Sequence, residues 1–294
     1  MLAASKKIEY LTLNFILACY VSWGILTVAH AVIPAWLLLP LLIVVLSFYG
    51  SLQHEIIHYH PTPWQKLNEA LGSPPLALYL PFIIYRDTHR EHHVLENISY
   101  PDKDPESYYM QAQSWQTLPA WLQTLYQWNN TLVGRILLGP ALGVSRFLLA
   151  EFKKLKAGDR YTLHAWLAYL PWLVLVLAWL VYWQFPIGLY LIACYFSISL
   201  TSIRIFAEHQ AVATPEQRTI VVEANGFLSY LFLQNNLHSV HHKYPALPWY
   251  QLRKTYQQER ETILQENGGY VFKTYLELFK RYAFKAKEGV VHPL

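Results

Sequence analysis

The sequence predicts an all-α integral membrane protein, in which a four-helix bundle carries a cytoplasmic helical cap with clustered histidines. Hydrophobic residues make up 54% of the 294-residue chain and charged residues only 14%, well below the quarter usual in soluble domains. Four apolar runs are long enough to cross a bilayer, at about 8–30, 35–53, 163–183 and 187–207. We therefore expect a single membrane domain over residues 1–294.

The first two runs form an expected antiparallel hairpin, because the link between them is short and contains the helix breaker Pro34. Both cysteines, Cys19 and Cys194, lie inside apolar runs. They are interpreted as small buried hydrophobic residues and not as a disulfide or an iron–sulfur site. The first run is too long for the apolar core of a cleavable signal peptide, and no small-residue cleavage site follows it.

Several segments outside these runs have their own character. Residues 74–85 are apolar but too short to span, so an interfacial, re-entrant or buried position is expected. Residues 97–119 are polar and aromatic and are predicted to form a surface loop. Residues 131–150 contain two arginines, which favours an amphipathic helix at the membrane surface. The basic run 151–160 suits anionic headgroups, and residues 251–294 are predicted to be a charged amphipathic tail.

The distribution of charge predicts the orientation in the membrane. Neither short connection, 30–35 or 183–187, contains a lysine or arginine. Every lysine and arginine of the chain therefore falls on the side of the membrane opposite these two connections. The positive-inside rule makes that side cytoplasmic, together with both termini and every histidine cluster. The net charge of +4 is mild and gives no reason to expect a nucleic-acid partner.

Three histidine clusters hold eight of the 13 histidines. On a helix, residues three and four apart share one face, so each cluster directs its imidazoles into one small volume. Neutral imidazole is a common ligand of iron, zinc, copper and nickel. Eight imidazoles are too many for one tetrahedral zinc site and suit two metal ions. The clusters are His54 and His58; His89, His92 and His93; and His238, His241 and His242.

In spacing, order and hydrophobic frame, these clusters resemble the three histidine boxes of the membrane fatty acid desaturase and hydroxylase superfamily. The resemblance covers most of the chain. Three flanking runs look like a bacterial desaturase-like branch, and they imply a bacterial inner membrane. They are Arg86-Asp87-Thr88-His89, Asp104-Pro105-Glu106-Ser107 and Leu247-Pro248-Trp249-Tyr250.

The resemblance implies a di-iron centre held by the eight box histidines, with O2 as co-substrate. It also implies a ninth ligand, His209, because an isolated histidine between the second and third boxes binds metal in that family. The expected reaction is desaturation of an acyl chain or another lipid-like substrate, with hydroxylation or ketolation by the same superfamily as the alternative. The chain contains no cytochrome b5-like segment, so a separate donor of two electrons is expected, either a ferredoxin or a cytochrome b5-like protein with its reductase.

Residues beside the boxes are candidates for supporting roles. His60 is expected to be exposed or to contact a ligand, and Glu55, Glu91 and Glu208 could orient imidazoles. Asn235 and Asn236 precede the third box, where a water-mediated metal contact is conceivable. No role is assigned to the three histidines at membrane or chain ends, which are His30, His164 and His292.

Two rival functions remain open at this point. The run His54-Glu55-Ile56-Ile57-His58 matches the H-E-x-x-H pattern of zinc metalloproteases, in which the glutamate is the general base. An intramembrane protease would leave the second and third boxes unexplained. A non-catalytic metal-binding or heme-binding membrane protein would explain histidines at membrane ends, but not the two three-histidine boxes.

Overall fold

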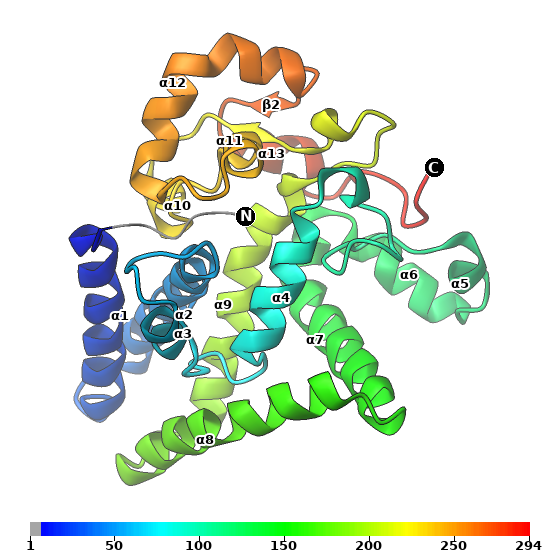
Figure 1. Ribbon diagram of the computed structural model, residues 1–294. Helices are drawn as coiled ribbons and strands as arrows, with labels where there is room; N and C mark the ends of the chain where they lie inside the picture. Colours follow the sequence, from blue (N-terminus) through cyan, green and yellow to red (C-terminus); the bar gives the residue numbers. More distant parts are fainter. Residues whose placement is uncertain (1–6) are drawn as a thin grey trace. The chain divides into compact units, whose positions relative to one another are not determined.

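Figure 1 shows the computed structural model of the chain, which describes residues 7–294. Helices dominate it, so the predicted all-α class is confirmed. The expected cytoplasmic N-terminus, at residues 1–6, lies outside the described residues.

The α-helices are α1 (Tyr10–Val28), α2 (Ala35–Ile57), α3 (Gln65–Gly72), α4 (Phe82–His92), α5 (Ala112–Gln116), α6 (Ala120–Asn129), α7 (Leu132–Lys156), α8 (Arg160–Tyr182), α9 (Ile187–Glu208), α10 (Phe227–Leu231), α11 (His238–Lys243), α12 (Trp249–Glu266) and α13 (Tyr275–Tyr282). Two 3-10 helices, η1 (Leu95–Asn97) and η2 (Pro215–Arg218), and two short strands, β1 (Val221–Val222) and β2 (Val271–Phe272), complete the described elements.

The chain divides into two compact units. The first contains the chain up to Asp87 together with Pro140–Leu200, and the second contains Thr88–Gly139 and Thr201–Leu294. Each unit is therefore assembled from two separated stretches of sequence. The single domain expected over 1–294 stays a prediction.

In the first unit, α1 and α2 lie side by side (Figure 1), as expected for the short turn at Pro34. Polar side chains join α1 to two further helices. The indole Nε1 of Trp23 donates to the Tyr190 hydroxyl of α9 at 2.9 Å. The indole of Trp179, on α8, donates to the Thr27 hydroxyl at 2.9 Å. Within apolar helices such hydrogen bonds fix neighbours without a large hydrophobic driving force.

Five helices among the described residues are long and apolar enough to cross a membrane. Four of them, α1, α2, α8 and α9, match the four predicted spans. The fifth is α7, which the sequence predicted to lie at the membrane surface over 131–150. The chain is a multi-helix membrane protein, but by length and composition it has one candidate span more than expected.

The apolar segment before α4 is irregular and packs inside the first unit. Leu76 is buried, which agrees with the buried alternative among the three positions predicted for 74–85. Irregular backbone in an apolar environment needs hydrogen-bond partners, and tyrosines supply them here. Tyr49 donates to the carbonyl of Pro74 at 2.8 Å, and Tyr190 donates to that of Leu76 at 2.6 Å.

The second unit has a small core around the parallel pair of β1 and β2. Its buried members include Phe206, Ile220, Phe272 and Leu278. The predicted tail 251–294 therefore has packed parts, since β2 and α13 belong to this core. α13 begins with a side-chain N-cap, in which the Thr274 hydroxyl accepts from the Glu277 N–H at 3.1 Å.

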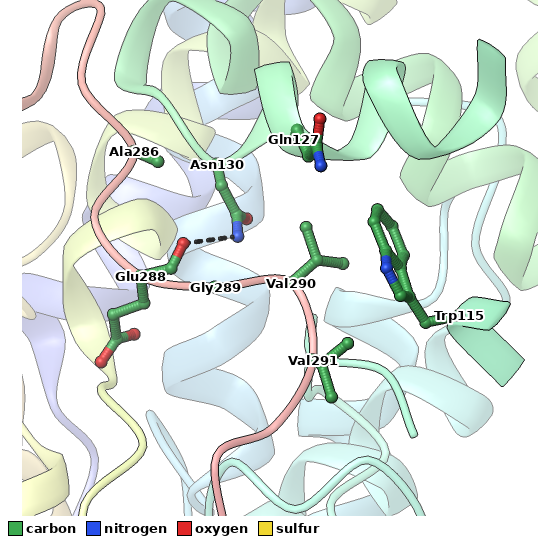
Figure 2. Close-up of a pocket in the computed structure, with 8 residues that line it drawn as sticks. All are labelled: Trp115, Gln127, Asn130, Ala286, Glu288, Gly289, Val290 and Val291. Atoms are coloured by element: carbon green, nitrogen blue, oxygen red, sulfur yellow. Dashed lines mark hydrogen bonds between the residues drawn. The ribbon is translucent and has the colours of Figure 1, made fainter. Parts of the chain in front are cut away.

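The C-terminal segment after α13 is hydrogen-bonded to two other parts of the second unit. Met110 and Val290 share a backbone hydrogen bond of 2.9 Å, and His292 N–H donates to the Met110 carbonyl at 3.0 Å. Figure 2 shows this segment beside α6, where the Asn130 amide donates to the Glu288 carbonyl at 3.2 Å. The end of the chain is therefore part of the fold and not a free tail.

Candidate metal centre

Two short helical segments bring six box histidines into the second unit. The last turn of α4 and the residue after it carry His89, His92 and His93, and α11 carries the third box. The spacing of three and four residues turns the imidazoles of each box toward the same side of its helix.

His209 follows α9 and is held by backbone hydrogen bonds on both sides. The Ile220 N–H donates to the Glu208 carbonyl, and the Gln210 N–H donates to the Arg218 carbonyl, both at 3.1 Å. The same short stretch also holds α11, because the Ser239 N–H donates to the Ile220 carbonyl at 2.9 Å. Residues 218–220 thus fix the isolated histidine and the third box to one backbone segment.

Four imidazoles of the second unit converge on one point. One ring nitrogen from each of His92, His209, His238 and His242 lies within 4.8 Å of those of the other three. The Nε2 atom of His209 is 3.0 Å from that of His92 and 3.0 Å from that of His238. The Nε2 atoms of His238 and His242 are also 3.0 Å apart.

The hydrogen bonds of this group suit a metal ion. The Nδ1 atom of His92 lies 2.8 Å from Asp104 Oδ1, and Nδ1 of His238 lies 3.0 Å from Asn235 Oδ1, so both Nδ1 atoms are donors. In the neutral rings the Nε2 atoms then carry lone pairs. Both lone pairs face His209 Nε2, which has at most one proton to donate. A metal ion satisfies all of these nitrogens together.

A second group of imidazoles lies in the same unit. His93 Nε2 is 3.1 Å from His89 Nε2 and 3.1 Å from His241 Nε2. The Nδ1 atom of His89 lies 2.9 Å from a carboxylate oxygen of Glu106, so its Nε2 atom also faces the group with a lone pair. Seven of the eight imidazoles of the second unit therefore form two groups.

The first box lies in the other unit, at the end of α2. His54 and His58 are buried, and their ring centroids are 5.1 Å apart. His60 is also buried, which excludes the exposed alternative, and its Nδ1 atom pairs with Glu9 at 2.6 Å. Glu55 is buried too, and its Oε1 atom lies 3.9 Å from His60 Nε2, which is ion-pair distance when His60 is protonated.

Asp104 and Glu106 are the residues that sequence reasoning missed. They belong to the predicted surface loop 97–119, and that prediction is wrong for Asp104, which is 3% exposed. The Ser99 N–H donates to its Oδ2 atom at 2.8 Å and the Glu106 N–H to its Oδ1 atom at 2.9 Å. The available signal was a pair of acids shortly after a histidine box, in a run otherwise poor in charge.

The other supporting candidates have different outcomes. Glu208 lies 3.5 Å from His238 Nδ1 and pairs with Arg204 at 2.7 Å, so it can orient the third box. Asn235 contacts the same imidazole directly, and Asn236 instead donates to the Val222 carbonyl at 2.6 Å. Glu91 is exposed.

The histidines without an assigned role belong to neither group. His164 is exposed on α8, and His30 Nδ1 lies 2.9 Å from the Thr27 carbonyl oxygen. His292 is buried and stacks on Tyr100 with a centroid distance of 4.5 Å, so it contributes to packing of the second unit.

Burial and carboxylates act in opposite directions on these imidazoles. Burial lowers the pKa of His209, His238 and His242 well below the ordinary value, which keeps them neutral and able to bind a metal. Burial also opposes protonation of His92, but Glu106 and the hydrogen-bonded Asp104 outweigh it and raise its pKa to about 9. A metal ion would compete with that proton for Nε2, while Asp104 keeps hold of Nδ1.

Comparison with known families agrees with this geometry. The family model described as fatty acid desaturase matches residues 31–274. The chain belongs to the fatty acid desaturase family. No curated protein matches the chain. The matched range contains all three histidine boxes and His209.

Family membership makes this desaturase-family chain an oxidoreductase of the membrane desaturase and hydroxylase type. The meeting of the second and third boxes accords with that class, because the protease pattern at His54-Glu55-Ile56-Ile57-His58 uses neither box. A heme-carrying or purely metal-binding protein would not account for the match over most of the chain.

Proposed function

We propose that the chain is a di-iron, O2-dependent desaturase that acts on an acyl chain or another lipid-like substrate. The observation that carries this proposal is the convergence of His92, His209, His238 and His242, with the Nδ1 atoms of His92 and His238 held by Asp104 and Asn235. The runs that resemble a bacterial branch support a bacterial inner membrane as its location.

The ligand set proposed for two iron ions contains nine histidines. The group around His209 supplies four imidazoles to one ion. His89, His93 and His241 supply three imidazoles to the second ion. We also assign His54 and His58 of the first box to the second ion, because it otherwise has fewer ligands than the first ion. A ligand set made only of imidazole nitrogens suits iron, because imidazole is a common iron ligand.

Bound iron would supply the activation of O2 needed to cleave unactivated C–H bonds. Overall, a –CH2–CH2– unit, O2, two electrons and two protons give a –CH=CH– unit and two molecules of water. The chain itself orients the ligands: Asp104 and Glu106 fix the second box, and Asn235 and Glu208 fix His238. A hydroxylase would insert oxygen into one C–H bond with the same ligands, so product analysis distinguishes the two.

We propose that the electrons come from a separate donor. Cys19 and Cys194 are both buried in the first unit, and two thiols are too few for a ferredoxin cluster. A ferredoxin, or a cytochrome b5-like protein with its reductase, fits this requirement.

Membrane topology is constrained by the same histidines. The second box precedes α7, and His209 and the third box follow α9, yet their imidazoles meet at 3.0 Å. We infer that both ends of this stretch lie on one side of the membrane and that an even number of helices among α7, α8 and α9 cross it. We assign the two crossings to α8 and α9, which are joined by a short uncharged turn, and an interfacial position to α7, which carries Arg135 and Arg146.

With α1 and α2 this gives four crossings, and the positive-inside rule supports cytoplasmic termini and a cytoplasmic metal centre. The lipid-like substrate could then reach the centre from the bilayer, while the donor approaches from the cytoplasm.

The test combines metal analysis with product analysis on the purified protein in nanodiscs. We expect about two irons per chain for the nine-histidine ligand set, and conversion of saturated acyl lipids to alkenes that depends on O2 and an added donor. His92→Ala should lose iron and activity, whereas His164→Ala, which alters an exposed histidine near the start of α8, should keep both. Stoichiometric zinc with peptide cleavage, or heme absorption, would overturn the proposal, and alcohols in place of alkenes would identify a hydroxylase.

A further inference from the structure

Helix α6 exposes a large apolar face. Trp121, Leu125 and Trp128 are spaced four and three residues apart and therefore lie on one side of the helix. Trp121 is 65% exposed and Trp128 is 58% exposed. Tryptophan is highly buried on average, so two exposed indoles on the same helical face require an apolar partner.

One polar side chain of α6, Gln123, is turned toward the protein, whereas Thr124 and Gln127 are exposed. The amide of Gln123 donates to the carbonyls of Trp115 and Leu118, at 3.1 and 3.0 Å. Gln127 lines a pocket together with Trp115 and the C-terminal segment, as Figure 2 shows. Leu122 and Tyr126 are half-buried, so the exposed face of α6 consists of Trp121 and Trp128 together with the polar residues Thr124 and Gln127.

The sequence around α6 is free of charge over an unusual length. No aspartate, glutamate, lysine, arginine or histidine occurs between Glu106 and Arg135. The stretch instead combines tryptophan and tyrosine with glutamine, asparagine, serine and threonine. Amphipathic aromatic rings concentrate at membrane–water interfaces, where the ring is in an apolar layer and its polar edge remains hydrated.

The helix is also continuous with a membrane-associated segment. Only Asn130 and Thr131 separate α6 from α7, which is long and apolar enough to enter a bilayer. The lipid around the chain is therefore the expected contact of the exposed face of α6.

We propose that α6 is an interfacial membrane anchor, with Trp121, Leu125 and Trp128 inserted between lipid headgroups. Because the helix has no charge, its insertion depends on apolar and aromatic contact and not on anionic lipid. It differs in this respect from the basic end of α7 at Lys153, Lys154 and Lys156. A second copy of the chain or a soluble protein on this face is excluded by the proposal.

The test places one nitroxide label at a time on the full chain in phosphatidylcholine nanodiscs. Trp121→Cys and Trp128→Cys report on the proposed anchor. Val174→Cys, on α8 and 60% exposed, serves as the lipid reference, and Gln257→Cys, exposed on the polar helix α12, serves as the water reference. The native cysteines are buried, and the unmutated protein treated in parallel measures their background.

Relaxation of each label is compared in the presence of O2, which partitions into lipid, and of a nickel chelate confined to water. The ratio of the two effects at positions 121 and 128 should lie close to the Val174 ratio and far above the Gln257 ratio. Anionic lipid should leave it unchanged. A ratio close to that of Gln257, or a requirement for anionic lipid, would overturn the proposal.

Protection from both reagents would reveal a protein partner or a second copy on this face, and would also overturn it. A second measurement avoids substitution altogether. In the unmutated protein, a photoreactive carbene precursor carried on an acyl chain should modify the peptide that contains Trp121 and Trp128. A water-soluble precursor should modify α12 instead, and the opposite pattern is incompatible with an interfacial anchor.

Discussion

Lys287 donates a hydrogen bond to the main-chain carbonyl of His209. The same ammonium group donates to the Phe206 carbonyl at 3.1 Å, and Tyr108 donates to the His209 carbonyl at 3.1 Å. The side chain of Lys287 is almost fully buried. A residue close to the end of the chain thus holds the backbone of a proposed iron ligand.

This contact predicts that Lys287→Met weakens iron binding. The substitution keeps most of the side-chain volume but removes the Lys287 hydrogen bonds to the Phe206 and His209 carbonyls. Tyr108 then remains as the donor to the His209 carbonyl, so the backbone of His209 is less well fixed. By analogy with residues that orient metal ligands, we expect a loss of about 10–100-fold in metal affinity or activity. Iron retained after dialysis against a graded chelator measures this effect.

Lys285→Met is the matched control, because Lys285 is exposed on the same segment. It should retain iron as the unmutated protein does. Equal iron retention by both variants would show that Lys287 does not position His209.

Asp104 provides a second prediction, since it holds the Nδ1 proton of His92. Asp104→Ala removes this acceptor and lets the imidazole rotate, so a loss of about 10–100-fold in iron affinity is expected. Asp104→Asn keeps one oxygen for the hydrogen bond, so its iron affinity should lie between that of the unmutated protein and that of Asp104→Ala. Metal analysis and the optical spectrum of the loaded protein report the change.

The control for Asp104 is Asp102→Ala, which changes an exposed carboxylate two residues earlier in the same loop. Full iron content in Asp104→Ala would contradict the proposed orienting role. A parallel loss in Asp102→Ala would point to a general defect of the loop.

The two preceding predictions concern residues that the sequence could not identify. The histidine boxes could be predicted from the sequence because helical spacing is a local pattern. The four spans could be predicted because hydropathy over about 20 residues is a strong signal. Asp104 and Lys287 act across separations of 12 and 78 residues from their partners, through an irregular loop and a C-terminal segment. No periodicity encodes such pairings, so the loop was predicted to be exposed and the tail to be merely amphipathic.

The segment before α4 illustrates a different limit of prediction. Its length excluded a membrane span, but three positions remained open until the tyrosine donors were known. Tyr49 and Tyr190 lie on helices far away in sequence, and their hydroxyls make burial of the irregular backbone possible. Helix α7 differs from this segment because it is long enough to span. Composition does not distinguish a membrane span of this length from a long interfacial helix.

Glu55 distinguishes oxidation from proteolysis at the first box. In a zinc protease this residue would activate the metal-bound water, and Glu55→Gln would abolish peptide cleavage while zinc remained bound. Here Glu55 lies 3.9 Å from His60, so we expect Glu55→Gln to retain donor-dependent O2 consumption at a reduced level. Complete loss of O2 uptake with full iron content would contradict this expectation.

Glu223 predicts a dependence of stability on pH. Hydrogen bonds from Arg260, at 2.7 Å, and from Tyr256, at 2.6 Å, lower the pKa of its carboxyl group. Because the folded pKa lies below the unfolded value, the stabilisation is present above the unfolded value of about 4.3 and is lost as pH falls through the folded pKa. Arg260 is half-exposed, so the contribution should stay below about 1 kcal/mol.

Glu223→Gln should therefore melt at a lower temperature than the unmutated protein near neutral pH, and the difference should shrink on acidification. Thermal unfolding in detergent at several pH values measures it. Glu261→Gln, on the exposed side of α12, is the control and should not change the melting temperature. A difference that grows as pH falls would contradict the assigned direction.

The topology of α7 can be decided with two cysteines. Lys156→Cys lies at the end of α7 and Gln184→Cys in the turn between α8 and α9, and both positions are exposed. If α7 is interfacial, a membrane-impermeant thiol reagent should reach position 156 only from the cytoplasmic side and position 184 only from the opposite side. If α7 crosses, the two positions exchange sides, and His209 would emerge opposite the second box. That outcome is incompatible with the 3.0 Å separation of His92 and His209, so exchanged labelling would refute the proposed metal centre along with the topology.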